Sequence, residues 1–152
     1  MREPKSLRAR AMDILSRREV SRLELQRKLA PYAEDEDELN QVLAEFAERN
    51  WQSDERFTEA FVNSKSHKHG ALRLKQALAA KGIDSEMARE FLPDSETELA
   101  NAKEVLRKKF KQPAADFAEK QKQMRFLLYR GFGMDTAQAA IRGAWAEDDG
   151  FE

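Results

Sequence analysis

Histidine and cysteine, the side chains most often used to bind metals or attack substrates, are nearly absent from this 152-residue chain. There is no cysteine, which excludes disulfides, thiolate zinc sites, iron–sulfur clusters and a cysteine nucleophile. His67 and His69 are too close in sequence to share one helix face and have no partner carboxylate motif. We therefore expect a polar turn leading into Gly70, with no metal and no cofactor.

The patterns that bind or hydrolyse nucleotides are missing as well. No G-x-x-x-x-G-K-[ST] loop occurs, and the only G-x-G, at 131–133, follows an expected helix instead of a strand. Carboxylates are abundant, but they stand in runs that stay solvated, whereas an acid–base pair needs a dry setting. No nucleophile stands beside a histidine base in a recognisable motif. The sequence therefore predicts a protein that is not an enzyme.

Lysines and arginines gather in three stretches of the chain. The formal net charge is −1, yet residues 1–30, 63–83 and 102–130 carry +5, +5 and +6, separated by acidic stretches. Such basic stretches suit a phosphate backbone, although for any single one a solvated face with local ion pairs is the simpler interpretation. The candidate binding residues are Arg17, Arg18, Arg22, Arg27, Lys28, Lys65, Lys68, Arg73, Lys75, Arg125 and Arg130.

Helices must position these cations, because apolar residues recur at helical spacing almost throughout the chain. Leu25 and Leu29 recur as Leu74 and Leu78 after a shift of 49 residues, and Leu127 follows after another 49, which indicates a repeat. We expect an all-α fold of three tandem three-helix repeats. The expected repeats span 5–51, 52–93 and 94–146, followed by an acidic tail at 147–152.

The ends of the expected helices support the repeat. Residues 78–83 and 127–132 both read Leu, three residues, glycine, apolar residue, which predicts Schellman endings at Gly82 and Gly131. The first repeat instead ends its middle helix at Pro31. The expected N-caps are Ser21, Ser53, Ser85 and Asp135. The expected helices span 5–18, 21–30, 35–50, 54–66, 70–81, 85–92, 94–110, 115–130 and 135–146.

Aromatic residues are mostly expected in the core, because they fall on the apolar stripes of the helices. Tyr32 and Tyr129, near the ends of middle helices, are the better candidates for stacking on a nucleic-acid base.

Three stretches of the sequence carry a family resemblance. They are R-R-E-V-S-R-L-E-L-Q-R-K-L at 17–29, W-Q-S-D-E-R-F-T-E-A-F-V at 51–62 with K-G-I at 81–83, and R-F-L-L-Y-R-G-F at 125–132. In order and spacing, over roughly residues 5 to 145, they resemble the signatures of the RecX family of bacterial recombination regulators.

This resemblance implies an elongated, curved molecule of three tandem three-helix repeats. It also implies a partner, because RecX proteins bind the RecA filament on single-stranded DNA, lodge in its groove, and inhibit or modulate strand exchange, ATP hydrolysis and the coprotease function. The ATPase belongs to RecA, so no catalytic residue is carried over. The matching stretches favour Arg17, Arg18, Arg27, Lys28, Lys65, Arg73, Arg125 and Arg130 as contacts.

Some positions depart from the family pattern. Asn63 and Lys65 stand where R-x-R is usual, Val20 stands where a histidine is common, and the turn at 67–70 is less glycine-rich. These changes would weaken or redistribute contacts of the second repeat.

Two other functions stay open from the residues alone. One is a stand-alone helical DNA-binding protein, although its acidic third helices would enter a major groove poorly. The other is a protein-binding scaffold whose basic stretches are only solvated. No stretch approaches the roughly 20 apolar residues of a membrane span. We expect a cytoplasmic monomer, and the family resemblance implies RecA and single-stranded DNA as its partners.

Overall fold

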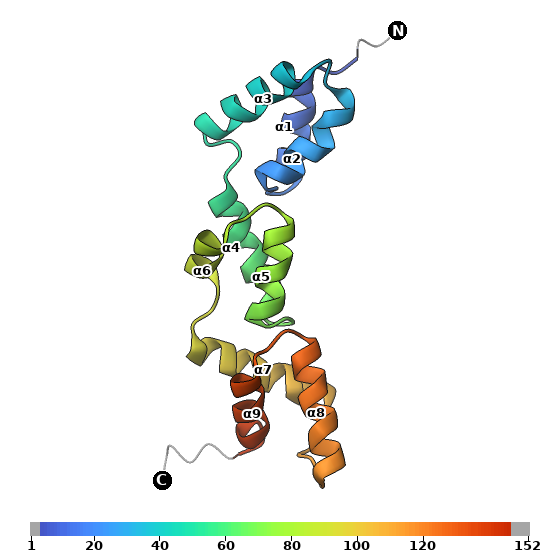
Figure 1. Ribbon diagram of the computed structural model, residues 1–152, viewed down its shortest axis with the longest axis vertical. Helices are drawn as coiled ribbons and strands as arrows, with labels where there is room; N and C mark the ends of the chain where they lie inside the picture. Colours follow the sequence, from blue (N-terminus) through green and yellow to red (C-terminus); the bar gives the residue numbers. More distant parts are fainter. Residues whose placement is uncertain (1–3, 147–152) are drawn as a thin grey trace. The chain divides into compact units, whose positions relative to one another are not determined.

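The structure, a computed structural model, describes residues 4–146, and the regular elements in that range are all helical (Figure 1). The predicted all-α class is thus confirmed, whereas the acidic tail expected at 147–152 lies outside the described residues. None of the described helices is both long and apolar enough to cross a membrane. The α-helices are α1 (Leu7–Arg17), α2 (Arg22–Leu29), α3 (Glu36–Glu48), α4 (Asp54–Lys65), α5 (Ala71–Ala80), α6 (Ser85–Phe91), α7 (Ser95–Lys109), α8 (Phe117–Tyr129) and α9 (Met134–Gly143), with a short 3₁₀ helix at Ala30–Tyr32.

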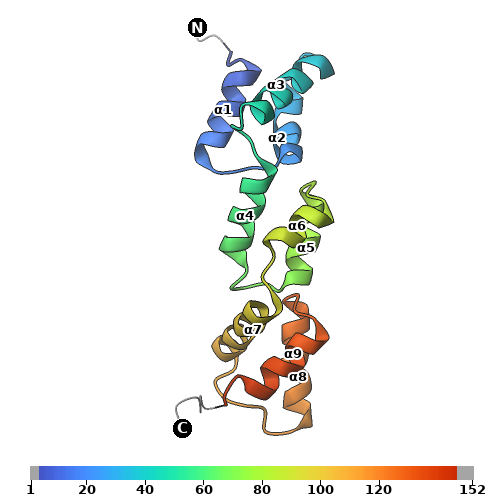
Figure 2. The ribbon, with the colours of Figure 1, turned by 90° about the vertical axis from the view of Figure 1, so that its left-hand side faces the viewer.

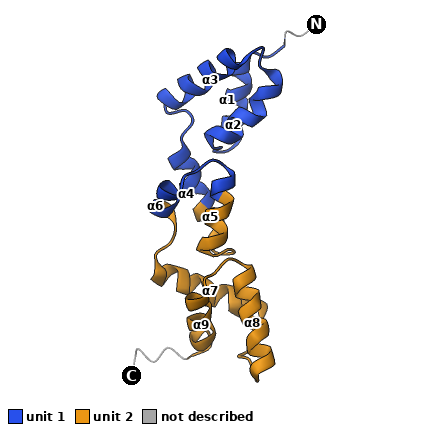
Figure 3. Cartoon of the chain, viewed as in Figure 1, with its two compact units in different colours: residues 1–61, 78–90 blue, residues 62–77, 91–152 orange. Residues whose placement is uncertain are grey.

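The chain divides into two compact units (Figure 3). The first contains Met1–Phe61 and Leu78–Glu90, and the second contains Val62–Ala77 and Phe91–Glu152. The boundary passes through α4 and α5, so each of these two helices contributes to both units, and it meets α6 at its last residue, Phe91. The exact limits of the three sequence repeats stay a prediction.

Each unit has its own hydrophobic core, built mainly from apolar stripes of α1, α2 and α3 in the first unit and of α7, α8 and α9 in the second. Figures 1 and 2 show α1, α2 and α3 grouped in the first unit, and α7, α8 and α9 grouped in the second. Fully buried side chains at helical spacing anchor both cores, and each contributes about 1.5–3 kcal/mol to stability. Among the largest of them are Leu25, Leu29 and Phe46 in the first unit and Leu106, Leu127 and Phe132 in the second.

Both predicted Schellman endings are confirmed. Gly82 and Gly131 have positive φ angles of 83° and 99°. The N–H of Ile83 donates to the carbonyl of Leu78 at 3.0 Å, and a bond of the same type follows Gly131. A third ending of this kind, at Asn50 with φ 60°, was not predicted, because asparagine is a less frequent residue in this conformation than glycine.

Two of the four predicted N-caps are confirmed. The Ser21 hydroxyl caps α2 within a capping box, and the Ser53 hydroxyl accepts the N–H of Arg56. Ser85 was a wrong choice, because the carboxylate of Asp84, one residue earlier, accepts the N–H of Met87 at 2.8 Å. Asp135 was also wrong: α9 begins at Met134, so this carboxylate lies inside the first turn, where it interacts favourably with the helix dipole.

In the first unit, the C-terminal end of α5 lies against the first turn of α2. A Cβ added to Gly82 would lie 2.9 Å from the Cβ of Leu23, so only glycine fits there without displacing its neighbour. Lys81 Nζ donates to Glu24 Oε2 at 2.8 Å. Partial burial opposes ionisation of Glu24, but the hydrogen bond from Lys81 and the charge of that lysine hold its pKa below the usual value.

In the second unit, the C-terminal end of α8 lies against the start of α5 in the same way. The N–H groups of Gly70 and Leu72 donate to the carbonyls of Arg130 and Gly131 at 2.8 and 3.1 Å. A Cβ added to Gly70 would lie 2.4 Å from the backbone of Gly131. The C-terminal end of α8 thus hydrogen-bonds to the start of α5, which satisfies free backbone acceptors of α8 and free donors of α5.

A buried carboxylate from α7 reinforces this second junction. Glu98 is only 6% exposed, and its Oε2 accepts the N–H of Ala71, the first residue of α5, at 2.7 Å. Burial raises the pKa of Glu98, and the hydrogen bond from Ala71 opposes that rise only in part. Glu98 thus caps a helix that lies 27 residues earlier in the chain.

Candidate nucleic-acid interface

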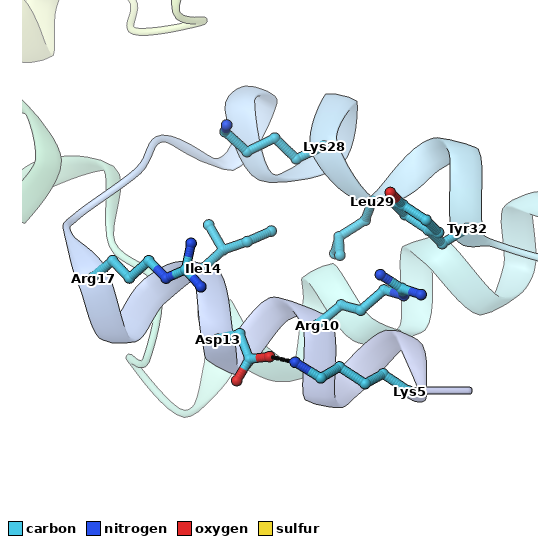
Figure 4. Close-up of a pocket in the computed structure, with 8 residues that line it drawn as sticks. All are labelled: Lys5, Arg10, Asp13, Ile14, Arg17, Lys28, Leu29 and Tyr32. Atoms are coloured by element: carbon cyan, nitrogen blue, oxygen red, sulfur yellow. Dashed lines mark hydrogen bonds and ion pairs between the residues drawn. The ribbon is translucent and has the colours of Figure 1, made fainter. Parts of the chain in front are cut away.

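A pocket between α1 and α2 brings together several cations of the first unit (Figure 4). We call it the α1–α2 pocket; its volume is about 310 Å³. Ile14 and Leu29 form an apolar floor, and the long charged side chains stand around it. The lining residues are Lys5, Arg10, Asp13, Ile14, Arg17, Lys28, Leu29 and Tyr32.

The charges of the α1–α2 pocket are unequal. Asp13 forms an ion pair with Lys5, and this hydrogen bond and charge hold the pKa of Asp13 below its usual value. Arg17 and Lys28 form no ion pair with any residue in the described part of the chain. The Arg10 guanidinium carbon lies 3.7 Å from the centre of the Tyr32 ring. The pocket therefore has excess positive charge and an aromatic side chain at its edge.

Three predicted cations of the first unit do not line this pocket. Arg18 lies 3.6 Å from the Glu24 carboxylate and donates to the carbonyl of Glu19, so local partners hold it. Arg22 and Arg27 are exposed on α2. Of the five cations predicted here, the structure thus brings together Arg17 and Lys28.

A second basic pocket lies between α7 and α8 in the second unit. We call it the α7–α8 pocket; its volume is about 460 Å³. Two of its cations come from the last turn of α7, and two lining residues come from the turn that precedes α5. The lining residues are His67, Lys68, Val105, Lys108, Lys109, Phe126 and Arg130.

Arg130 has a structural task in this pocket besides its charge. Its Nη1 donates to the carbonyl of Lys68 at 3.1 Å. Its guanidinium carbon also lies 4.9 Å from the centre of the Phe126 ring, in cation–π contact. Arg130 therefore fixes the turn that carries Lys68 against α8.

The pKa of His69 reports the local potential beside the α7–α8 pocket. Partial burial lowers it first, and the positive charges of Arg73, Arg130, Lys65 and Lys68 lower it further. Four of the predicted cations therefore lie near one imidazole, and their charges disfavour its protonation. The turn at 67–70, predicted only as a polar connection, is the place where the basic residues of the second and third predicted repeats meet.

The remaining predicted cations lie outside both pockets. The guanidinium carbon of Arg73 lies 5.7 Å from the centre of the Tyr129 ring. The Tyr129 side chain is 76% exposed. Lys75 is half-buried on α5, and Arg125 is exposed on α8.

Four pocket cations were missed in the sequence: Lys5, Arg10, Lys108 and Lys109. All four lie in the basic stretches, but outside the motifs from which candidates were chosen. Arg10 could have been found by helical spacing, because it is seven residues before Arg17 and therefore on the same face of α1. The lysines of α7 carry no such signal, since only the fold brings them to α8.

No group of three or more histidine and carboxylate side chains that could hold a metal ion is found within residues 4–146. The arrangement is thus one of cations and aromatic rings, which can bind phosphates and stack on bases.

Comparison with known families gives two matches along the chain. The model described as the second three-helix domain of RecX matches residues 53–92, and the one described as the third three-helix domain matches residues 96–141. Together these matches cover more than half of the sequence.

Curated relatives are similar over almost the whole chain. A protein named Regulatory protein RecX from Neisseria meningitidis serogroup B is 66% identical over 152 residues, which is 100% of this chain and 98% of the relative. One of the same name from Chromobacterium violaceum is 50% identical, covering 99% and 97% of the two chains. Among solved structures, the crystal structure of RecX from Lactobacillus salivarius has a TM-score of 0.81 at 21% identity and covers 91% of this chain and 94% of that one, which supports the fold of tandem three-helix domains.

Proposed function

This chain belongs to the RecX family, and on that basis we propose that it binds RecA and its filament on single-stranded DNA and inhibits or modulates RecA recombinase, ATPase and coprotease activities. The observation that carries the proposal is the near full-length similarity to proteins named regulatory proteins. In this proposal the chain is a cytoplasmic monomer that acts by occupying a surface, and any chemistry belongs to RecA.

The basic pockets supply the contacts to DNA phosphates in this proposal. Arg17 and Lys28 would contribute from the α1–α2 pocket, and Lys68 and Arg130 from the α7–α8 pocket. The acidic first turn of α3, at 36–38, would instead face basic protein surfaces.

Strand exchange by RecA tests the proposal. The purified chain, added at less than one molecule per RecA monomer, should lower the yield of exchanged duplex and should co-sediment with the filament. Normal strand exchange together with no co-sedimentation, across a wide range of concentrations, would refute it.

The His69 imidazole provides a pH-dependent prediction for the same binding. Its pKa is lowered by burial and by four nearby cations, so a bound polyanion should raise that pKa towards the ordinary value. Binding then takes up protons, so affinity for single-stranded DNA should increase as the pH falls through the pKa values of the free and bound forms. Titration of the His69 ring signals by NMR, with and without an oligonucleotide, measures the shift. An unchanged or lower pKa of His69 in the complex would contradict it.

A further inference from the structure

We propose that the α1–α2 pocket binds one nucleotide unit of single-stranded DNA, with the phosphate between Arg17 and Lys28 and the base stacked on the Arg10–Tyr32 pair. The inference rests on the proposed function only in that the chain must encounter single-stranded DNA. It adds a defined site and a division of its residues into a phosphate end and a base end.

The phosphate end of the pocket is inferred from two cations that form no ion pair in the described residues. Arg17 ends α1 and Lys28 lies in the last turn of α2, and both side chains border the pocket (Figure 4). The carboxylate of the pocket, Asp13, is engaged by Lys5. The charge of Arg17 helps to lower the pKa of Asp13, but neither Arg17 nor Lys28 forms an ion pair in the described residues. A phosphate between these two cations would therefore displace no existing ion pair.

The base end follows from the stacked pair at the other side of the pocket. Tyr32 is 56% exposed even though Arg10 covers part of its ring at 3.7 Å. Guanidinium planes and aromatic rings are both platforms for unpaired bases. The floor formed by Ile14 and Leu29 offers apolar contact to a base or sugar between the two ends. Such a site distinguishes single strands from duplexes, in which the base faces are stacked already.

An acidic peptide is the competing ligand for a basic pocket. It would use the cations but would gain little from an exposed tyrosine with an arginine stacked on it, or from an apolar floor. The combination of free cations, stacked pair and floor therefore favours a nucleotide, and Tyr32 is the residue that separates the two ligands.

Fluorescence anisotropy with a labelled oligothymidylate, in the absence of RecA, tests the site. Tyr32→Ala should weaken binding about 5-fold or more, whereas Tyr32→Phe should keep most of the affinity, because stacking needs the ring and not the hydroxyl. Arg17→Gln with Lys28→Gln should make the log–log salt slope shallower by about 1.4, or about 0.7 for each phosphate that the protein no longer neutralises. The matched control is Arg89→Gln, an exposed cation on α6 in the same unit that lines neither pocket; it should leave binding unchanged.

Photocross-linking locates the base directly. An oligonucleotide containing 5-bromodeoxyuridine should cross-link to Tyr32, mapped by mass spectrometry of the digested wild-type protein. Full affinity of Tyr32→Ala, with no cross-link at this residue, would overturn the proposal. An oligoglutamate peptide that displaces the oligonucleotide and shows the same dependence on Arg17 and Lys28, with no effect of Tyr32, would instead assign the pocket to an acidic protein segment and would also overturn it.

The outcome can be separated from that of the proposed function. The anisotropy and cross-linking measurements contain no RecA, whereas inhibition of strand exchange is measured with the wild-type chain. Tyr32-dependent binding without inhibition would support the pocket and refute RecA regulation. Inhibition of strand exchange without Tyr32-dependent binding would support RecA regulation and refute the pocket.

Discussion

Replacing Gly131 with alanine is expected to destabilise the protein by at least about 3 kcal/mol. The residue has a φ of 99°, a conformation that costs alanine energy by itself. The added Cβ would also lie 2.3 Å from the Cβ of Arg73 and 2.8 Å from its backbone nitrogen. Because backbone atoms of α5 form part of the obstruction, a rotamer change cannot relieve it. Urea denaturation followed by circular dichroism should show the loss of stability.

Gly133→Ala is the matched control for this substitution. Gly133 has an ordinary φ of −71°, and a Cβ placed there meets no atom within 4 Å. Its cost should stay below about 1 kcal/mol, as for a modest change at an N-cap. Equal unfolding midpoints for the two variants would mean that the close approach of α8 to α5 does not stabilise the second unit.

Reversing the charge of the two lysines of α7 that line the α7–α8 pocket is expected to raise the concentration needed for half-inhibition of RecA at least about 10-fold. Lys108 and Lys109 line the α7–α8 pocket and are exposed, so Lys108→Glu with Lys109→Glu should leave the fold intact. Because two fewer phosphates are neutralised, the salt slope of single-strand binding should also become shallower by about 1.4. Inhibition assays at several salt concentrations measure both effects.

The control for that variant is Lys120→Glu with Arg142→Glu, which changes the net charge equally in the same unit. These two residues line a different hollow, beside Ile141, and neither borders the α7–α8 pocket. The control should inhibit almost as well as the wild type. An equal loss of inhibition in both variants would mean that only overall charge matters.

The structure also changes which substitutions are informative. From the sequence alone, Arg125→Glu with Arg130→Glu is the natural test of the third basic stretch. Arg130, however, donates to the carbonyl of Lys68 and stacks on Phe126, so its replacement would disturb the turn as well as the charge. The lysines of α7 avoid this ambiguity.

Local patterns made much of the fold predictable. Apolar spacing located the helices, and glycine followed by an apolar residue located the endings at Gly82 and Gly131, because both signals act within a few residues. The cap at Asp84 was missed because a serine and an aspartate compete for adjacent positions. The ending at Asn50 was missed because its residue is less diagnostic than glycine.

The candidate site was less predictable, because tertiary contacts assemble it. Charge counts identified the basic stretches, and Arg17, Lys28, Lys68 and Arg130 do line pockets. No local pattern in the sequence predicted that Lys109, from α7, would line the same pocket as Lys68, from the turn before α5. Their proximity depends on the approach of α8 to α5, in which the backbones of two distant glycines come together.

ATP hydrolysis by RecA on single-stranded DNA tests the central proposal most directly. The wild-type chain, titrated against a fixed concentration of preformed filament, should lower the steady-state rate of hydrolysis well before it equals RecA in concentration. It should do so without hydrolysing ATP itself. A rate that stays constant up to a several-fold excess of the chain, under salt conditions in which the chain binds single-stranded DNA, would contradict the proposal.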